Sequence, residues 1–329
     1  MRVLVIGAAG MIGRKLCAAL ARDGALGGRP IESAHFVDLV APAPLPAPFP
    51  AQCEALDLCA EGASERLIAE RPDVVFLLAA VVSGEAERDF DKGYAINLDA
   101  TRRLFEAIRH EREASGGAYV PRLVFASSIA VFGVPFPETI GDDFHLTPLT
   151  SYGTQKAVCE LLLADYSRRG IFEGVGLRLP TICVRPGKPN TAVSGFFSSI
   201  IREPLEGREA ILPAPDTVRH WFASPRAAVG FFLHAAVLDV KRLAGRPNLT
   251  LPGVSATVAE QIEALRRSAG DGAVRLIRHE PDAKVREMIA GWPTRFDARR
   301  ATALGFAAEA DFDEIIRVYL EDDHVAAVA

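Results

Sequence analysis

Short apolar runs alternate with longer amphipathic segments along the first half of the chain. This alternation predicts a parallel sheet whose strands are joined by helices packed on its two faces. We expect strands at residues 3–6, 35–38, around 53–57, 74–78, 123–126 and 174–179. We expect helices at residues 11–22, 61–70, 87–110 and 152–168.

Beyond Pro180 the alternation gives way to short pieces separated by proline and glycine, with helical patterns at residues 226–238, 258–268 and 312–320. The pattern predicts an α/β protein in which residues 1–180 form a doubly wound parallel sheet. Residues 181–329 are expected to form a smaller mixed α/β lobe that completes a substrate cleft. The boundary is soft, because later elements can pack back onto the first sheet.

The composition supports a folded protein that acts on small molecules. The chain has 329 residues, of which 49% are hydrophobic and 24% charged. This apolar content can bury a large core, which excludes disorder over most of the length. The formal net charge of −5 argues against nucleic acid or an anionic membrane as the main partner. The apolar run at residues 74–82 is too short for a membrane span and suits a buried strand.

The cysteines contain no C-x-x-C pair, and their number is odd: Cys17, Cys53, Cys59, Cys159 and Cys183. This pattern predicts reduced thiols and a cytoplasmic location, with neither a disulfide framework nor a metal site. The first residues, one basic residue followed by apolar ones, bear some likeness to a signal peptide. The regularly spaced glycines that follow favour a strand and a turn instead.

Gly7, Gly10 and Gly13 form a G-x-x-G-x-x-G motif between the first predicted strand and the first predicted helix. Glycines in this setting allow a tight turn, close approach of the backbone to a pyrophosphate, and close packing of helix on strand. Met11 and Ile12 open the helix, whose free N–H groups face the negative charge. The motif therefore predicts a dinucleotide site.

Asp38 closes the second predicted strand, where a carboxylate can accept hydrogen bonds from the adenosine ribose. It would repel a 2′-phosphate, and residues 37–49 contain no lysine or arginine to neutralise one. NAD is therefore preferred over NADP, although an ordinary exposed aspartate at a strand end is the alternative interpretation. Asp57 and Leu58 follow the third predicted strand and are candidates for contact with the adenine.

Tyr152 and Lys156 are four residues apart, so a helix places both side chains on one face. A tyrosine normally titrates near pH ~10 and is not a base at neutral pH. A nearby ammonium group and a positively charged nicotinamide ring could lower that pKa. Two solvated surface residues are the alternative, because this spacing occurs by chance in many helices.

Taken together, the motifs resemble the extended short-chain dehydrogenase/reductases, over about residues 1–187. The matching residues are Gly7, Gly10, Gly13, Asp38, Asp57-Leu58, Leu78-Ala79-Ala80, Asn97, the segment 127–133 (SSIAVFG) and the segment 152–156 (YGTQK). The resemblance implies a Rossmann fold, NAD as cofactor, and chemistry at the carboxyl ends of the strands. It also implies a homodimer formed by the helices at about residues 87–110 and 152–168, in which the leucines at 161–163 could take part.

The resemblance implies a role for each matching residue. Ser128 would hold the reacting oxygen, Tyr152 would act as general acid/base, and Lys156 would lower the tyrosine pKa and hold the nicotinamide ribose. Asn97 would help to order the proton relay. The implied cofactor-binding residues are Gly7, Gly10, Met11, Ile12, Gly13, Asp38, Asp57, Leu58, Leu78, Ala79, Ala80, Asn97, Tyr152, Lys156, Pro180 and Ile182.

Departures from the family's subclasses narrow the expected reaction. Sugar-nucleotide dehydratases carry an Asp-Glu pair after the catalytic serine or threonine, whereas Ile129 and Ala130 follow Ser128 here. The segment beginning Arg219-His220 replaces the second-half motif that is common in nucleotide-sugar epimerases, which puts nucleotide-sugar recognition in doubt.

Several other segments are similar to the family members that oxidise the C2 hydroxyl of a four-carbon sugar acid of the D-erythronate type. A small anion needs hydrogen-bond donors, and Arg185 or Arg219 could hold its carboxylate bidentately. Inter-lobe or surface salt bridges are the alternative role for these basic residues. The expected substrate-binding residues are Ser83, Ser128, Tyr152, Arg185, Asn190 and Arg219, with Lys188 nearby.

Two alternative functions remain open. A nucleotide-sugar 4-epimerase that retains NAD is the main alternative function, and a non-catalytic NAD-binding redox sensor is the second. His220 is a candidate for substrate contact, but packing or orienting the substrate suits it better than a role as base; His145 is a weaker candidate.

Overall fold

The computed structural model describes residues 1–187 and 193–324. Its centre is a seven-stranded sheet in which every neighbouring pair of strands runs parallel. In spatial order the strands are β12 (Asn248–Thr250), β8 (Glu173–Leu179), β7 (Arg122–Ser128), β6 (Val74–Leu77), β1 (Arg2–Ile6), β4 (Ser33–Asp38) and β5 (Ala51–Ala55). The six strands expected from the first half are confirmed, and the seventh comes from the second half.

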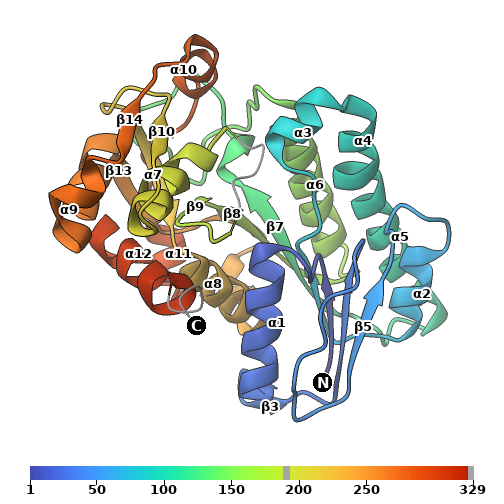
Figure 1. The fold of residues 1–329 in the computed structure, drawn as a ribbon. Coiled ribbons are helices and arrows are strands. Elements are labelled where there is room, and N and C mark those ends of the chain that lie inside the picture. Colours follow the sequence, from blue (N-terminus) through green and yellow to red (C-terminus); the bar gives the residue numbers. More distant parts are fainter. Residues whose placement is uncertain (188–192, 325–329) are drawn as a thin grey trace.

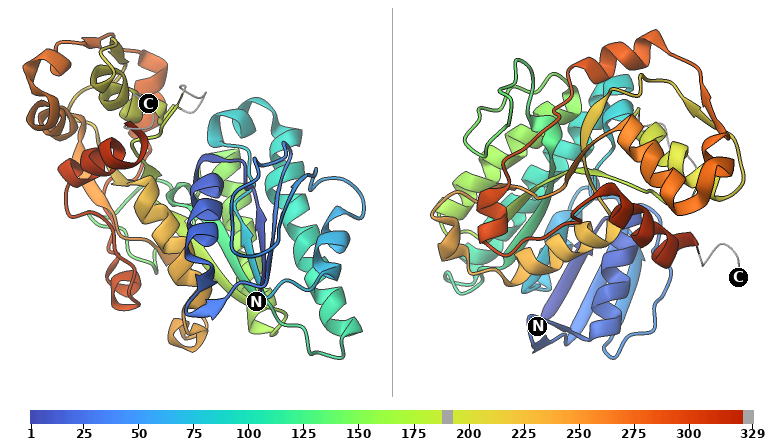
Figure 2. Two further views of the ribbon diagram at one scale, coloured as in Figure 1. Left: turned by 60° about the horizontal axis from the view of Figure 1, so that its bottom comes forward. Right: turned by 90° about the vertical axis from the view of Figure 1, so that its left-hand side faces the viewer.

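Helices cover both faces of this sheet (Figures 1 and 2). One face packs against α1 (Met11–Asp23) and α8 (Pro225–Val237), and the other against α2 (Ala63–Ala69), α5 (Ala100–Ala114) and α6 (Ser151–Arg168). Two apolar cores result, one on each side of the sheet. The doubly wound α/β prediction is therefore confirmed.

The single long helix expected at residues 87–110 is wrong at its beginning. The structure has α3 (Ser83–Arg88), α4 (Phe90–Tyr94), a π-helical turn at Ala95–Asp99, and then α5. Asp89 separates α3 from α4, because its backbone is non-helical (φ −127°, ψ 87°) and its carboxylate accepts a hydrogen bond from the N–H of Lys92. A side chain that caps a new helix competes with continuation of the old one.

The second lobe lies beside the carboxyl-terminal side of the sheet (Figure 1). It contains a small sheet of β9 (Thr181–Ile182), β11 (Arg219–Ala223) and β13 (Val254–Thr257), and a pair formed by β10 (Ala210–Leu212) and β14 (Ile277–His279). Its helices are α7 (Gly195–Leu205), α9 (Val258–Val274), α10 (Ala283–Ala290) and α12 (Phe312–Tyr319), whereas α11 (Arg299–Ala303) packs against β12 of the central sheet. Residues of α7, α9 and α12 share a third apolar core.

Helices α8, α9 and α12 confirm the helical patterns expected in the second half. Helix α9 runs further than expected and is interrupted at Gly270, whose φ of +75° leaves the helical region. Strand β12 and helix α8 return to the central sheet, so the second half also completes the first core. Within the described residues, no helix combines the length and apolar character needed to cross a membrane.

A buried ion-pair network also joins the halves. Arg178 on β8 donates to both carboxylate oxygens of Glu160 on α6, at 2.8 and 3.0 Å, and both side chains are almost fully buried. Asp142 lies between Arg178 and Arg300, and its carboxylate is 3.2 Å from the Arg300 guanidinium. These contacts fix the end of β8, where the chain passes from the sheet into the second lobe.

Candidate active site

The predicted site residues converge at the carboxyl ends of the central strands. Gly7 follows β1, Asp38 ends β4, and Leu78 follows β6. Ser128 ends β7 and is the register partner of Leu179 on β8. Strand order reverses at β1, and such a switch point is where open α/β sheets bind ligands.

The glycine turn leaves no room for larger side chains. Gly7 has a φ of +95°, and a Cβ added there would lie 2.5 Å from the backbone nitrogen of Ala79. A Cβ at Gly13 would lie 2.0 Å from the carbonyl oxygen of Gly7. Gly10 is the N-cap of α1, with no side chain to satisfy the helix's first N–H groups. The turn therefore brings bare backbone and open N–H groups together, an arrangement that suits a pyrophosphate.

Asp38 holds this turn from the side. One carboxylate oxygen accepts from the N–H of Ala9 at 2.9 Å, and the other from the N–H of Leu39 at 2.7 Å. Each oxygen keeps a further lone pair, so both ribose hydroxyls can still donate to it. Leu39 and Val40, which sequence reasoning missed, are 68% and 70% exposed and offer an apolar surface beside the expected ribose.

Several other cofactor candidates lie in a turn after β5 or against the apolar cores of the sheet. Asp57 is exposed, and its carboxylate accepts from the N–H of Cys59 at 2.8 Å in a turn after β5. Leu58, Leu78 and Ala79 are partly buried against the sheet's cores.

Ser128, Tyr152 and Lys156 form one cluster. Thr150 caps the start of α6, its side chain accepting from the N–H of Gly153, which places Tyr152 in the first turn. The ammonium group of Lys156 lies 5.7 Å from the centre of the Tyr152 ring and donates to the carbonyl of Ala126 at 2.8 Å.

The ionisation of this cluster is set mainly by burial. Burial raises the pKa of Tyr152, while contacts with the Ser128 hydroxyl and the Arg185 guanidinium act in the opposite direction. Burial also lowers the pKa of Lys156 to about 8. Arg185 is therefore a second cation beside the phenol, a role that the sequence did not suggest for it.

Asn97 connects the cluster to the loop after β6. Its amide group accepts from the N–H of Val81 at 2.9 Å and donates to the Val81 carbonyl and to Gln155. Its own carbonyl accepts from the hydroxyl of Thr101. It stands in the π-helical turn, a distortion often found at functional sites.

The two candidate arginines have different surroundings. The positive charge of Arg185 acts on Tyr152, and its Nε donates to the Ile182 carbonyl at 3.0 Å. Arg219 instead donates to the Ser255 carbonyl at 2.9 Å and pairs with Glu260 at 3.1 Å. The structure thus distinguishes the two arginines: the charge of Arg185 acts on Tyr152, whereas Arg219 is bonded to residues of the second lobe.

The remaining candidates for substrate contact are Ser83, Lys188, Asn190 and His220. Ser83 begins α3 and is partly buried. Lys188 and Asn190 lie outside the described residues. His220 is buried on β11 and contacts Thr181, which lies between the cofactor candidates Pro180 and Ile182.

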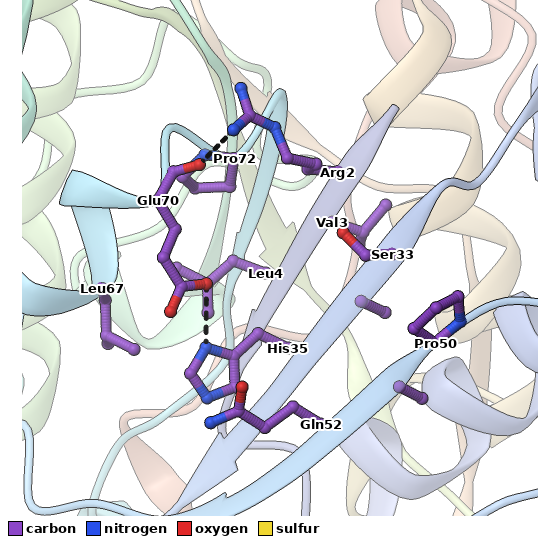
Figure 3. Close-up of a pocket in the computed structure, with 12 residues that line it drawn as sticks. Arg2, Val3, Leu4, Ser33, His35, Pro50, Gln52, Leu67, Glu70 and Pro72 are labelled. Carbon is purple, nitrogen blue, oxygen red and sulfur yellow. Dashed lines mark hydrogen bonds and ion pairs between the residues drawn. The ribbon is translucent and has the colours of Figure 1, made fainter.

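A separate pocket of about 380 Å³ lies on the central sheet, away from this cluster. Figure 3 shows His35 on β4 directed toward Glu70, and its ring nitrogens lie 3.4 Å from Glu70 and 2.9 Å from Glu54. Arg2 and Ser33, at the amino ends of β1 and β4, also line it. None of the predicted site residues that the structure describes lines this pocket, so it is distinct from the site at the carboxyl ends.

Residues 3–224 match the model of the NAD dependent epimerase/dehydratase family. The chain belongs to this family. The D-erythronate dehydrogenase of Cupriavidus necator is 45% identical to the chain over 99% of this chain and 100% of the relative. The D-erythronate dehydrogenase of Haemophilus influenzae is 40% identical over 98% and 100%, respectively.

A solved structure of this family is also close. It is described as the nucleoside-diphosphate-sugar epimerase from Agrobacterium tumefaciens, and it is 58% identical to the chain with a TM-score of 0.97. The match covers 100% of this chain and 96% of that one.

As a member of the family, the chain is an NAD-dependent oxidoreductase. The glycine turn fits the cofactor's pyrophosphate, because backbone occupies the space that side chains would need. Asp38 fits an unphosphorylated ribose, as its carboxylate would repel a 2′-phosphate.

Proposed function

We propose that this protein oxidises the C2 hydroxyl of a four-carbon sugar acid of the D-erythronate type to the 2-oxo acid. The observation that carries the proposal is the partly buried Arg185, which follows β9, whose Nε donates to the Ile182 carbonyl, and whose positive charge acts on the phenol of Tyr152. A cation that can bind a carboxylate bidentately is thus within electrostatic reach of the groups that would act on the neighbouring carbon. The names of two relatives that match almost end to end support the same substrate.

In the proposed mechanism, Ser128 donates a hydrogen bond to the reacting oxygen and Tyr152, as phenolate, accepts the C2 hydroxyl proton. Lys156 and Arg185 favour the phenolate by their positive charge. NAD supplies the hydride acceptor, the C4 atom of its nicotinamide. Holding the reacting groups in line supplies most of the rate advantage, and proton transfer contributes roughly 10²–10⁴-fold.

Arg185 is the proposed carboxylate clamp. Its Nε is held by the Ile182 carbonyl, so the guanidinium plane has a fixed orientation before substrate arrives. Burial lowers the pKa of Arg185, which a bound carboxylate would offset by favouring the charged form. Arg219 is not proposed as the clamp, because it donates to the Ser255 carbonyl and pairs with Glu260 within the second lobe.

The direct test follows NADH formation when the purified protein is given NAD and D-erythronate. Stoichiometric formation of NADH and of a 2-oxo acid is expected. Binding of NAD without turnover on any four-carbon sugar acid would contradict the proposal and favour a redox sensor.

The second candidate function is epimerisation of a nucleotide-sugar with NAD retained, which the description of the 58% identical structure favours. Such an enzyme regenerates its NAD in each cycle and therefore accumulates no NADH. Conversion of a UDP-sugar to its 4-epimer, with NAD remaining bound through purification, would support this function instead.

We further propose a cytoplasmic homodimer that uses the exposed side of α4 and α6. Leu161 is 67% exposed and Phe90 is 59% exposed, whereas Leu163 is fully buried in the chain's own core. Replacement of Leu161 by glutamate is expected to yield a monomer in light scattering. Met288→Glu, at a 48% exposed position on α10, is the matched control and should leave the mass unchanged.

A further inference from the structure

Thr181 and His220 form a hydrogen bond where the two lobes meet. Thr181 opens β9, two residues after Leu179, which is the register partner of Ser128. His220 lies on β11, the parallel neighbour of β9. The Thr181 hydroxyl oxygen and Nε2 of His220 are 2.7 Å apart. The register therefore places Thr181 on the segment that continues β8 past the neighbour of Ser128, and the proposed mechanism uses neither Thr181 nor His220.

The second ring nitrogen determines the direction of this hydrogen bond. Nδ1 of His220 lies 3.0 Å from the backbone carbonyl of Pro293. A carbonyl can only accept, so Nδ1 has to carry the proton of the neutral ring. Nε2 is then left with a lone pair, and the Thr181 hydroxyl must donate to it.

The ring of His220 is fixed in this state by its surroundings. It is only 3% exposed and stacks on Phe197 at 5.4 Å with an interplanar angle of 5°. Trp292 and Phe222 contact it from other directions, at 5.2 and 5.4 Å. Burial lowers the pKa of His220 to about 4, so the ring is neutral at physiological pH.

We infer that His220 orients the Thr181 hydroxyl so that it can only accept a hydrogen bond from the substrate, and that Thr181 thereby selects a hydroxyl group beyond C2. Thr181 is only partly buried, and its oxygen retains a lone pair once its proton is directed at His220. Arg185, four residues further on, can only donate. Thr181 therefore requires a hydroxyl group of the substrate as donor, and Arg185 requires a carboxylate as acceptor. This inference rests on the proposed function.

The consequence is a preference for polyhydroxylated acids over simple 2-hydroxy acids. A substrate without the hydroxyl leaves the Thr181 oxygen without a donor in a partly desolvated site. Sites built to bind a substrate hydroxyl reject the analogue that lacks it much more strongly than apolar pockets do. A carboxylate placed at Thr181 would meet an acceptor, which disfavours binding of the sugar acid in reverse.

The test compares D-erythronate with (R)-2-hydroxybutanoate, which keeps the carboxylate and the C2 hydroxyl but lacks the other two. Thr181→Val keeps the side-chain shape and removes the hydroxyl. It is expected to lower kcat/KM for D-erythronate roughly 10- to 100-fold and to leave that for (R)-2-hydroxybutanoate nearly unchanged. Thr181→Ser should restore most of the preference.

His220→Phe retains the ring that stacks on Phe197 and removes both nitrogens. As a positioning residue, His220 is expected to affect the ratio of kcat/KM for D-erythronate to kcat/KM for (R)-2-hydroxybutanoate. The variant should lose activity on D-erythronate selectively while keeping its affinity for NAD. Where oxidation of (R)-2-hydroxybutanoate is too slow to follow, its inhibition constant against D-erythronate replaces kcat/KM.

Thr250→Val is the matched control, because Thr250 is fully buried on β12 and its hydroxyl has no hydrogen-bond partner among the described residues. It should leave the ratio unchanged. Equal losses on both substrates in Thr181→Val, or an unchanged ratio in His220→Phe, would overturn the inference. A wild-type protein that oxidises neither acid would instead contradict the proposed function, so the two failures are distinguishable.

Discussion

The proposed cofactor side and the proposed substrate side of the site are made of different parts of the polypeptide. Backbone forms much of the cofactor side: the turn from Gly7 to Gly13 works because side chains are absent from it. Side chains form the substrate side, and Arg185 and Thr181 depend on partners such as Ile182 and His220. A motif therefore describes the first surface well, whereas the second depends on which residues the fold brings together.

Tyr152, the proposed base, belongs to the part of the site where cofactor and substrate would meet, and its replacement tests that part. Tyr152→Phe removes the proposed base and is expected to lower turnover by roughly 10²–10⁴-fold, because proton transfer is lost while positioning remains. NAD affinity, measured by titration calorimetry, should stay close to that of the wild type. Retained turnover in this variant would refute the assignment.

Gly13→Ala tests the claim that the cofactor side is backbone. The added Cβ would lie 2.0 Å from the carbonyl oxygen of Gly7, so the turn must move, and the loss of one backbone hydrogen bond to the charged pyrophosphate is expected to lower the affinity for NAD roughly 10- to 100-fold. Gly230→Ala on α8 is the control, because nothing lies within 4 Å of a Cβ there. Similar NAD dissociation constants for the two variants would show that the turn is not the pyrophosphate site.

The two arginines test the substrate side directly. Arg185→Met is expected to raise KM for D-erythronate roughly 10- to 100-fold, because a charge-assisted hydrogen bond is lost. Arg219→Met should change it only a few-fold, since Arg219 already binds Ser255 and Glu260. Thermal melting controls for loss of structure. The reverse order of effects would move the carboxylate to Arg219.

The smallest expected effect is a shift in the pH dependence of oxidation when Arg185 is replaced. This shift tests whether the charge of Arg185 lowers the pKa of Tyr152, the proposed base. Activity should rise with pH as Tyr152 ionises, and because burial raises the pKa of this phenol, the rise is expected on the alkaline side of neutrality. Since Arg185 acts to lower the pKa of Tyr152, Arg185→Met should move the rising limb to higher pH, by about one pH unit or less. Arg219→Met should keep the wild-type profile of kcat/KM. A rising limb that stays in place in Arg185→Met would place that guanidinium away from the phenol.

Local sequence patterns predicted six of the seven strands of the central sheet, because most of these strands are short apolar runs between turn residues, whereas β12 was not predicted. The break at Asp89 was missed, since an aspartate in an amphipathic stretch can lie on an exposed helix face or begin a new helix. Only contacts made after folding distinguish the two outcomes, here the bond from the N–H of Lys92.

The glycine turn, Asp38 and the Ser128–Tyr152–Lys156 cluster could all be named from the sequence, because their chemistry requires particular residue types at particular intervals. Arg185 and Arg219 were equivalent at that level, as each is an arginine in the second half with no local motif to separate them. The fold separated them by placing Glu260 beside one and Tyr152 near the other.

By itself, the sequence determined the doubly wound fold and predicted the NAD site and the catalytic cluster, because periodicity, glycine geometry and helical spacing are local properties. The tertiary structure alone decided which arginine acts electrostatically on Tyr152 and which direction the Thr181 hydroxyl points. The physical reason is that both depend on neighbours far away in the chain: Pro293 fixes the proton of His220, and His220 in turn fixes the proton of Thr181.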